Sequence, residues 1–422
     1  MDDSYDKERH WHHGRTIGVT ATFQPAPSTA QGSGISWLWW AGLPVGALAL
    51  LAVAGWAWRA EPARPAPASP VPLVAWNIRF PDAPPDSQVA GYNGTYAPGE
   101  VLFAPPESPV RCQPSPREAS GAFDAADSLW LAQGGRFEAD GAFFTPRQPG
   151  LYRLAWRSGN DNDPAKMLNV LVLNRAERRE ADRRTVVRVL NQDIGSYGDP
   201  KESRIEKIQQ HARRYQPPEY FTVLGPETLQ LKVGRNLELG QLIAFIDRRG
   251  TDGKKIYTTT RHTNVLPPSK ALCDKLSLLM ERLQAQGVKV TRFWITSGFR
   301  TPSYNRSIGG AAYSRHCYGD AVDLVIDENG DRRMDDLNGD GRIDKLDGLV
   351  IAQACQALER EGAVVVGGIG IYEWDAEDSV RSHVHLDCRG YPARWGQIAR
   401  GRSKLGYDWW SELEGSGLDG GD

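Results

Sequence analysis

Residues 314–323 read SRHCYGDAVD, and residues 383–385 read HVH. The first segment supplies a histidine and a carboxylate close together, and the second, about sixty residues later, supplies a further histidine. Two imidazoles and one carboxylate leave one position of a tetrahedral zinc open for water, which is how a catalytic zinc is held, whereas a structural zinc has four protein ligands. The two segments therefore predict a zinc site of the catalytic kind.

The residues around the first segment predict a β-strand. Residues 319–326 alternate, and one face would carry the apolar side chains of Val322, Leu324 and Ile326. A period of two then turns Asp323 to the opposite face. His316 would lie in the turn just before this strand, within reach of the same metal.

Residues 382–388 alternate in the same way. Val384 and Leu386 would face the core, and the other face would carry His383, His385 and Asp387. Two neighbouring strands of this kind would bring three ligands to one point.

The pattern Ser-x-His-x-x-Gly-x-Ala-x-Asp with a later His-x-His resembles the zinc D-alanyl-D-alanine carboxypeptidases. Relatives of that family include the vancomycin-resistance D,D-dipeptidases and phage L-alanyl-D-glutamate endolysins. The resemblance covers roughly residues 266–395 and includes SGFRTP at residues 297–302 and RGYPARW at residues 389–395. It implies a zinc peptidase domain whose substrate is peptidoglycan.

The resemblance also implies a role for each motif residue. Carried over by position, the zinc ligands are His316, Asp323 and His385. His383 would assist catalysis beside the metal, and Arg300 would orient or stabilise the substrate near the scissile bond.

Metal-assisted hydrolysis needs a neighbouring group that takes a proton from water and returns it to the leaving amine. Some branches of the family place a glutamate or aspartate three residues before the last zinc histidine, where this chain has Ser382. We therefore expect His383 to handle the proton. Asp387 is the second candidate, and it could equally hold an imidazole as an outer partner.

Alternatives to an enzyme exist, because a His-x-His pair alone more often lies on a surface or in a core, and a fold does not guarantee an activity. A catalytically inactive, zinc-containing cell-wall-binding anchor would bind muropeptides without turnover. A calcium-controlled adhesion module is a third interpretation.

Residues 336–347 read DLNGDGRIDKLD and match the EF-hand calcium loop. Oxygen ligands fall at positions 1, 3, 5 and 9, glycine at position 6 and an acid at position 12. With position 7 included, the ligand residues would be Asp336, Asn338, Asp340, Arg342, Asp344 and Asp347. We expect a structural calcium loop outside the catalytic step, and a solvated acidic loop is the alternative.

Composition sets the broader frame. The chain has 422 residues, which is enough for two or three domains. Its net charge of -2, with 24% charged residues, does not indicate a nucleic-acid-binding protein. Five cysteines are too few for a disulfide framework. Cys317 and Cys388 lie near the zinc-site residues, and a disulfide between them would require an oxidising compartment.

The N-terminal part predicts a membrane anchor. Residues 1–34 read as a disordered polar tail. Residues 35–58 contain no charged residue and are long enough, at about 1.5 Å per residue, to cross a membrane core of about 30 Å. Tryptophans near both ends are typical of an aromatic belt. A cleaved signal peptide is the alternative, but the long polar leader argues against it.

The orientation of this anchor is inferred from the substrate. Arg59 and Arg64 follow the span closely, so local charge does not favour an N-terminus inside the cell. Because the resemblance implies peptidoglycan as substrate, we expect a single-pass protein of the bacterial cytoplasmic (inner) membrane, with its catalytic domain in the periplasm or cell envelope.

The remaining segments complete the predicted organisation. Residues 59–72 form a Pro-rich linker, residues 73–175 a β-sandwich-like domain, with an immunoglobulin-like fold as one option, and residues 176–265 a mixed connecting region. Residues 266–400 form the peptidase domain and residues 401–422 a C-terminal tail. The same order of segments, with an Asp-Leu-Asn-x-Asp-Gly loop, occurs in a bacterial subgroup that this chain resembles.

The peptidase domain is predicted to be α+β, an antiparallel sheet with helices. Leucines spaced along residues 269–286 predict a helix that stops at Gly287. A second helix is expected over residues 348–361, with strands over residues 364–372 and 382–388. The expected function is a zinc metallopeptidase with one catalytic zinc that acts on peptidoglycan stem peptides. D,D-carboxypeptidase, L,D-carboxypeptidase and endopeptidase activities all fit the same metal chemistry.

Overall fold

A computed structural model describes residues 75–115, 128–132, 136–137, 142–157, 167–249, 255–373, 382–400 and 403–409. All of these residues fall within one compact unit, residues 68–422. The predicted polar tail, membrane anchor and Pro-rich linker lie outside the described residues. Within the described ranges, no helix has the length and apolar character that crossing a membrane requires.

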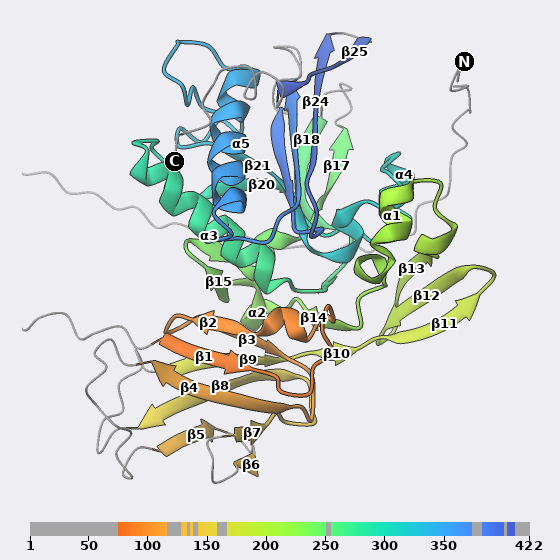
Figure 1. The fold of residues 1–422 in the computed structure, drawn as a ribbon, viewed down its shortest axis with the longest axis vertical. Coiled ribbons are helices and arrows are strands. Elements are labelled where there is room, and N and C mark those ends of the chain that lie inside the picture. The colour runs from red at the N-terminus through yellow and green to blue at the C-terminus, as the bar shows by residue number, and fades with distance from the viewer. Residues whose placement is uncertain are drawn as a thin grey trace, which may run out of the picture. The chain divides into compact units, whose positions relative to one another are not determined.

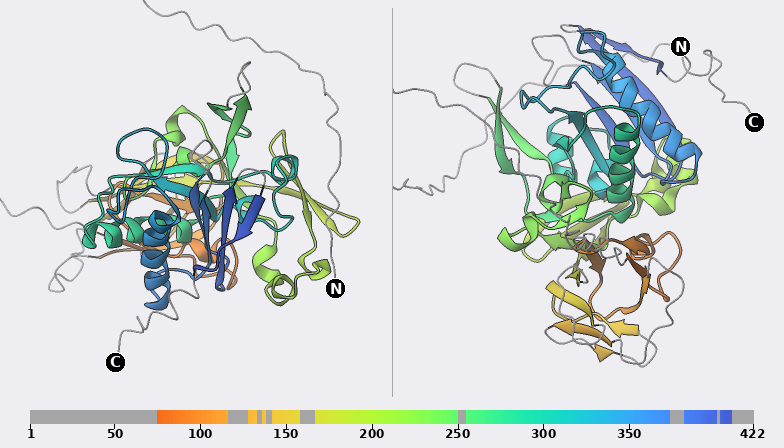
Figure 2. Two further views of the ribbon diagram at one scale, coloured as in Figure 1. Left: turned by 90° about the horizontal axis from the view of Figure 1, so that it is seen from above. Right: turned by 90° about the vertical axis from the view of Figure 1, so that its left-hand side faces the viewer.

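Residues 75–172 build two β-sheets, drawn in orange and yellow in Figures 1 and 2. The first has the order β2-β1-β4-β7-β6 and the second the order β3-β9-β8-β5. Trp76 of the first sheet and Phe103 of the second are completely buried in the hydrophobic core. The bounds are β1 (Ala75–Arg79), β2 (Gly94–Tyr96), β3 (Val101–Ala104), β4 (Pro109–Ser115), β5 (Ser128–Ala132), β6 (Arg136–Phe137), β7 (Ala142–Phe144), β8 (Gly150–Arg157) and β9 (Met167–Val172). The region is β-rich, and an immunoglobulin-like fold stays a prediction.

The connecting region consists of small sheets and short helices. Its sheets have the orders β10-β14-β19, β11-β12-β13, β15-β16 and β17-β18. The strands are β10 (Asn174–Arg175), β11 (Glu177–Ala181), β12 (Arg184–Val189), β13 (Gln192–Gly198), β14 (Tyr220–Val223), β15 (Lys232–Gly234), β16 (Leu237–Glu238), β17 (Phe245–Arg249), β18 (Lys255–Arg261) and β19 (Val265–Leu266). The short helices are α1 (Glu206–Gln210) and α2 (Pro226–Leu229).

The C-terminal part is built on a six-stranded sheet with the order β20-β21-β23-β22-β24-β25. Strands β20, β21, β24 and β25 are labelled in Figure 1. Its strands are β20 (Phe293–Ser297), β21 (Ala321–Ile326), β22 (Gly368–Glu373), β23 (His383–Asp387), β24 (Ala393–Arg400) and β25 (Ser403–Gly406). The predicted antiparallel sheet needs one correction, because β22 and β24 are parallel. The chain reverses after β23, so β24 runs against β23 and therefore along β22.

The predicted C-terminal tail also needs a correction at its start. Residues 403–406 form β25, which pairs with β24 in an antiparallel register. Trp409 follows this strand, is completely buried, and donates its indole N–H to the backbone oxygen of Trp395. Burial of this large aromatic ring explains why the chain continues the sheet here instead of ending at β24.

Two helices pack against each other and cover the sheet on the side away from the candidate ligands. The predicted helix over residues 269–286 is confirmed as α3 (Lys270–Ala285), with the Ser269 hydroxyl capping its first turn. Its apolar stripe is buried, as are the facing residues of α5 (Lys345–Arg360). The prediction for α5 began three residues too late, because the side chains of Asp344 and Asp347 form a capping box. A further short helix is α4 (Pro302–Ser307).

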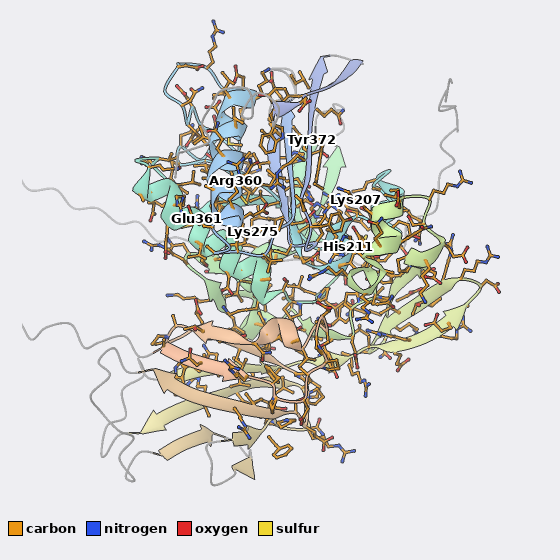
Figure 3. All side chains as sticks on the ribbon, viewed as in Figure 1. Lys207, His211, Lys275, Arg360, Glu361 and Tyr372 are labelled. Atoms are coloured by element: carbon orange, nitrogen blue, oxygen red, sulfur yellow. The ribbon has the colours of Figure 1, made fainter. Side chains whose placement is uncertain are left out.

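A buried lysine links the two helices to the sheet. Lys275 of α3, labelled in Figure 3, is fully buried, and its Nζ lies 2.7 Å from Glu359 Oε1 of α5. The same ammonium donates to the backbone oxygen of Asp387, at the end of β23. Glu359 also accepts hydrogen bonds from Gly367 N and the Arg394 guanidinium. Since removing one partner would leave a buried charge uncompensated, this network holds the ends of β22 and β23 in place.

All five cysteines are buried and unpaired: Cys112, Cys273, Cys317, Cys355 and Cys388. The structure thus has free thiols at Cys317 and Cys388, where a disulfide was one option. Burial raises the pKa of each of the five thiols well above its usual value. None of them lies in the group of possible metal ligands.

Candidate metal centre

Three segments deliver the candidate ligands. His316 lies on a short 3-10 turn (Arg315–Tyr318) that ends at Gly319, which has φ of 77°. A Cβ at Gly319 would collide with the backbone oxygen of Pro267, so only glycine fits there. Asp323 lies on β21 and His385 on β23, and the two are directly opposite each other in the antiparallel register. Asp323 and His385 therefore lie on the strands that the alternation predicted, and His316 lies in the turn before β21, as expected.

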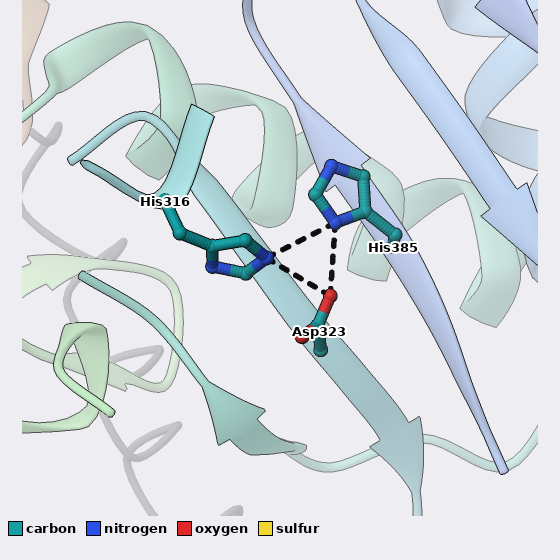
Figure 4. A group of neighbouring side chains, drawn as sticks. All are labelled: His316, Asp323 and His385. Carbon is teal, nitrogen blue, oxygen red and sulfur yellow. Dashed lines mark hydrogen bonds and ion pairs between the residues drawn. The ribbon is translucent and has the colours of Figure 1, made fainter. Parts of the chain in front are cut away.

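The ligand atoms converge on one point (Figure 4). His316 Nε2 lies 3.1 Å from Asp323 Oδ1 and 3.2 Å from His385 Nδ1, and His385 Nδ1 lies 2.9 Å from Asp323 Oδ1. Ligands bound at about 2.0 Å around a tetrahedral zinc lie about 3.3 Å from one another. The triangle therefore has nearly the size that one zinc ion needs, and its two nitrogens and one oxygen are a donor set that zinc accepts.

The opposite end of each candidate ligand is held by an outer partner. His316 Nδ1 lies 2.8 Å from the backbone oxygen of Gly298, and His385 Nε2 lies 3.1 Å from Asp387 Oδ2. The second oxygen of Asp323 accepts from Arg300 Nη2 at 2.5 Å. Such partners fix the tautomer and orientation of metal ligands, so these bonds leave His316 Nε2, His385 Nδ1 and Asp323 Oδ1 for a cation.

The electrostatics of the cluster keep its carboxylate charged. Burial would raise the pKa of Asp323, but the neighbouring His316, His383 and Arg300 hold it well below its usual value. Burial, with help from Arg300, lowers the pKa of His316 to about 4, so this imidazole is neutral at pH 7. Burial lowers the pKa of His385 as well, but its hydrogen bonds to Asp323 and Asp387 outweigh this and raise it above its usual value. A metal would therefore compete with a proton chiefly at His385.

The remaining predicted residues surround this triangle. His383 Nε2 lies 3.8 Å from Asp323 Oδ1, close to the cluster but outside the three converging atoms. Arg300 also donates from Nε to Ser297 Oγ at 2.8 Å, so its guanidinium holds a candidate ligand. Asp387 is completely buried and contacts His385, which matches the outer-partner alternative for this residue.

Asp387 is itself held from several sides. Its Oδ1 accepts from the backbone N–H of Gly368 at 2.7 Å and of Arg389 at 3.0 Å. The Arg389 guanidinium donates to both carboxylate oxygens. Burial would raise the pKa of Asp387, but His385 and Arg389 keep it well below its usual value. Asp387 is thus an ionised, fixed acceptor for His385, which leaves it poorly suited to shuttle a proton.

Sequence reasoning missed an aromatic wall built by β22 and β24. The Trp395 ring lies 5.1 Å from the His385 ring, and its Nε1 donates to the Tyr372 hydroxyl at 2.8 Å. Tyr372 stacks on His383, with ring centres 4.6 Å apart. A Cβ at Gly370 would collide with the Trp395 ring. The signal that could have found this wall is the alternation of Gly368, Gly370 and Tyr372, which leaves room on one face of a strand.

The acidic loop at residues 336–347 is arranged differently. Asp336 accepts from the backbone N–H groups of Gly339 and Gly341, and Asp340 accepts from that of Arg342. Asp347 is completely buried and accepts from the backbone N–H groups of Leu337 and Asp344. These carboxylates therefore organise the loop backbone and the start of α5. Calcium at this loop stays a prediction.

The chain also resembles a known protein family in the segment that carries two of the three candidate ligands. Residues 252–346 match the family model of Peptidase M15. Peptidase M15 enzymes use zinc, so the match and the His316–Asp323–His385 cluster together support a zinc metallopeptidase. No curated protein and no solved structure matches the chain.

The Peptidase M15 match covers less than a quarter of the chain. It contains Arg300, His316 and Asp323, and it ends before His383 and His385. His385 joins the cluster through the pairing of β21 with β23. The structure thus supplies the third member of the cluster, which lies outside the matched segment.

Proposed function

We propose that this chain is a zinc-dependent peptidoglycan peptidase that hydrolyses stem-peptide bonds, as a D,D-carboxypeptidase or a related endopeptidase. The observation that carries the proposal is the convergence of His316 Nε2, Asp323 Oδ1 and His385 Nδ1 on one point. Three protein ligands leave a position for water, which separates a catalytic zinc from a structural one. The Peptidase M15 match supports the same chemistry.

The residues around the cluster divide the work of hydrolysis. When bound, zinc would lower the pKa of water to about 7 and polarise the scissile carbonyl. His383, beside the cluster, takes the proton of the attacking water and returns it to the leaving amine. Asp387 orients His385, and Arg300 holds Asp323 ionised and in position. Since Arg300 is partly exposed, it can also face the substrate.

The substrate and location in this proposal come from the sequence. Peptidoglycan stem peptides are the proposed partner, and residues 35–58 are the proposed anchor in the bacterial inner membrane. The catalytic domain would then face the periplasm or cell envelope. A proteinase digest of intact spheroplasts tests this directly, since the domain should be cut from outside only if it faces that way.

Calcium binding at residues 336–347 is a separate part of the proposal. It is supported by oxygen side chains at the spacing of an EF-hand loop and by Gly341 at the sixth position. The calcium would stiffen the entry into α5 and take no part in hydrolysis. Its test is a comparison of unfolding with calcium and with a chelator, described below.

The experiment for the central proposal measures metal and turnover on the same protein. Bound zinc is quantified in the full chain, which is then incubated with purified muropeptides, and the products are identified by mass spectrometry. About one zinc per chain with loss of an amino acid or a cut cross-link is the expected result. The product also names the bond.

Two variants control this experiment. His385→Ala should lose both zinc and products, whereas His211→Ala, a histidine of the connecting region that stacks on Tyr391, should keep both. Zinc without any product would favour the wall-binding anchor. Folded protein without zinc would refute the metal site.

A further inference from the structure

We propose that Tyr372 is a further catalytic residue of this site, whose hydroxyl donates a hydrogen bond to the scissile carbonyl oxygen as that oxygen gains negative charge. The inference rests on the peptidase function proposed above. It concerns a residue of β22, which lies outside the segment matched to Peptidase M15.

The position of Tyr372 follows from the register of the sheet. Tyr372 is directly opposite His383, and Gly370 is directly opposite His385. Because strand residues two apart share a face, Tyr372 lies on the face of the sheet that carries the candidate ligands. Its ring stacks on His383, whose Nε2 is 3.8 Å from Asp323 Oδ1. Tyr372, which is labelled in Figure 3, therefore lies beside the cluster, and its side chain is only partly buried.

The hydroxyl of Tyr372 has a fixed hydrogen-bond polarity. Trp395 Nε1–H can only donate, and it does so to the Tyr372 oxygen at 2.8 Å. The phenol hydrogen must therefore point elsewhere. Within the described residues no acceptor for that hydrogen is found. Burial raises the pKa of Tyr372, so the phenol keeps its hydrogen at neutral pH.

The alternation of glycines on β22 explains how this arrangement is possible. A Cβ at Gly370 would collide with the Trp395 indole, and a Cβ at Gly368 would collide with Asp387. The Trp395 ring occupies the space above Gly370 and reaches both His385 and Tyr372. One indole thus packs on a candidate ligand and orients the donor beside it.

The two arginines near the cluster already donate to carboxylates, so the oxyanion can have a further donor. Arg300 already donates to Asp323 and Ser297, and Arg389 donates to Asp387. A preorganised neutral donor aimed at the developing oxyanion contributes only where charge appears in the reaction. Tyr372 meets two conditions for that donor: Trp395 fixes its oxygen, and its hydrogen has no acceptor among the described residues.

Tyr372→Phe is the test, because it keeps the ring on His383 and removes only the hydroxyl. We expect zinc content and KM for muropeptides to stay unchanged and kcat to fall about 100- to 1000-fold, as when one oxyanion donor is lost. Tyr152→Phe removes a tyrosine hydroxyl in the N-terminal sheets that donates to the backbone oxygen of Gln148, and it should leave kcat unchanged.

A binding measurement separates this role from a structural one. The probe is a phosphinate peptide with a tetrahedral PO2⁻ group in place of the bond that wild-type protein cuts. Tyr372→Phe should weaken its affinity by about the same factor as kcat, while the affinity for the reaction product stays the same. Trp395→Phe should produce a smaller loss of the same kind, since it removes the N–H that orients the phenol.

Three results would overturn the role of Tyr372. A Tyr372→Phe protein within about threefold of wild type in both kcat and phosphinate affinity overturns the inference and leaves the proposed peptidase intact. Equal loss of phosphinate and product affinity makes Tyr372 a packing residue and also overturns it. Wild-type protein that binds zinc and yields no product overturns the proposed function, and this inference falls with it.

Discussion

The His316–Asp323–His385 cluster and the acidic loop at residues 336–347 both carry ligand side chains at motif spacing, but their ligand atoms point in different directions. In the cluster the atoms converge from a turn and two strands, and outer partners hold their far ends. In the loop the carboxylates turn back onto backbone N–H groups of the same loop. The comparison teaches that a site assembled by the fold leaves its donors free for a cation, whereas a local loop can satisfy its own acids.

The largest expected difference between the two regions appears when one candidate ligand in each is replaced by alanine. His385→Ala should reduce bound zinc from about one per chain to almost none and abolish muropeptide hydrolysis, because two ligands hold zinc poorly. Asp340→Ala, on the exposed loop, should leave both unchanged. Metal analysis and product detection on the two variants measure this, and equal zinc loss in both would contradict the contrast.

Replacing an outer partner of a candidate ligand should have a smaller effect on zinc affinity. Asp387→Asn keeps the size of the side chain but removes its charge, so His385 loses its ionised acceptor and Arg389 its partner. We expect zinc affinity to fall about 10- to 100-fold, with the fold retained. Competition with a chelator measures the affinity. Asp340→Asn is the matched change in the loop and should leave zinc affinity unaltered.

We expect the pH dependence of zinc binding to arise mainly from His385. Its pKa is raised in the metal-free protein, so zinc must displace a proton there, and zinc affinity should fall about tenfold per pH unit once the pH lies below that pKa. The stability of the metal-free protein should change with pH in the opposite direction to zinc affinity. The stability that the proton provides is complete below about pH 6.5 and is lost as the pH rises through the raised pKa.

Chelator competition and thermal unfolding between pH 5 and 8, with and without zinc, measure both trends. The expected result is a gain in melting temperature from zinc that grows as the pH rises. A zinc-induced gain that is constant across this range would show that His385 does not exchange a proton for the metal.

The loop gives the smallest effect. Asp347→Asn weakens a buried acceptor for backbone N–H groups at the start of α5, and we expect a loss of about 1–2 kcal/mol of unfolding free energy with or without calcium. Asp340→Ala removes the acceptor for the backbone N–H of Arg342 and should lower stability more with calcium present than with a chelator. Chemical denaturation under both conditions measures this. Calcium that stabilises neither wild type nor Asp347→Asn would remove calcium from the proposal.

Much of the cluster could be predicted from the sequence because its order is local. A two-residue period on β23 places His383, His385 and Asp387 on one face, and the same period places Asp323 on β21. Helix α3 was equally readable, since its leucines repeat at helical spacing between Ser269 and Gly287. The expectation that the two strands are neighbours also came from the motif, and the fold supplied their register, with Asp323 opposite His385.

The rest depends on contacts between distant segments. Trp395 reaches Tyr372 because β24 runs parallel to β22, and the glycines of β22 indicate free space on one face without identifying Trp395 as the residue that fills it. Lys275 sits between Asp274 and Leu276 in the sequence and reads as a surface lysine, but it is buried against Glu359. The start of α5 was missed because Asp344 and Asp347 were interpreted as calcium ligands, whereas they also cap the helix.

The five buried thiols have a consequence for how the chain must mature. In the folded protein each is at most 5% exposed, with a pKa raised by burial, so oxidants and thiol–disulfide exchange can hardly reach a thiolate. Before the core closes, the same five thiols are open to mispairing. If the domain folds in the oxidising envelope, folding competes with oxidation, and refolding yield should depend on the redox buffer while the activity of the finished protein does not.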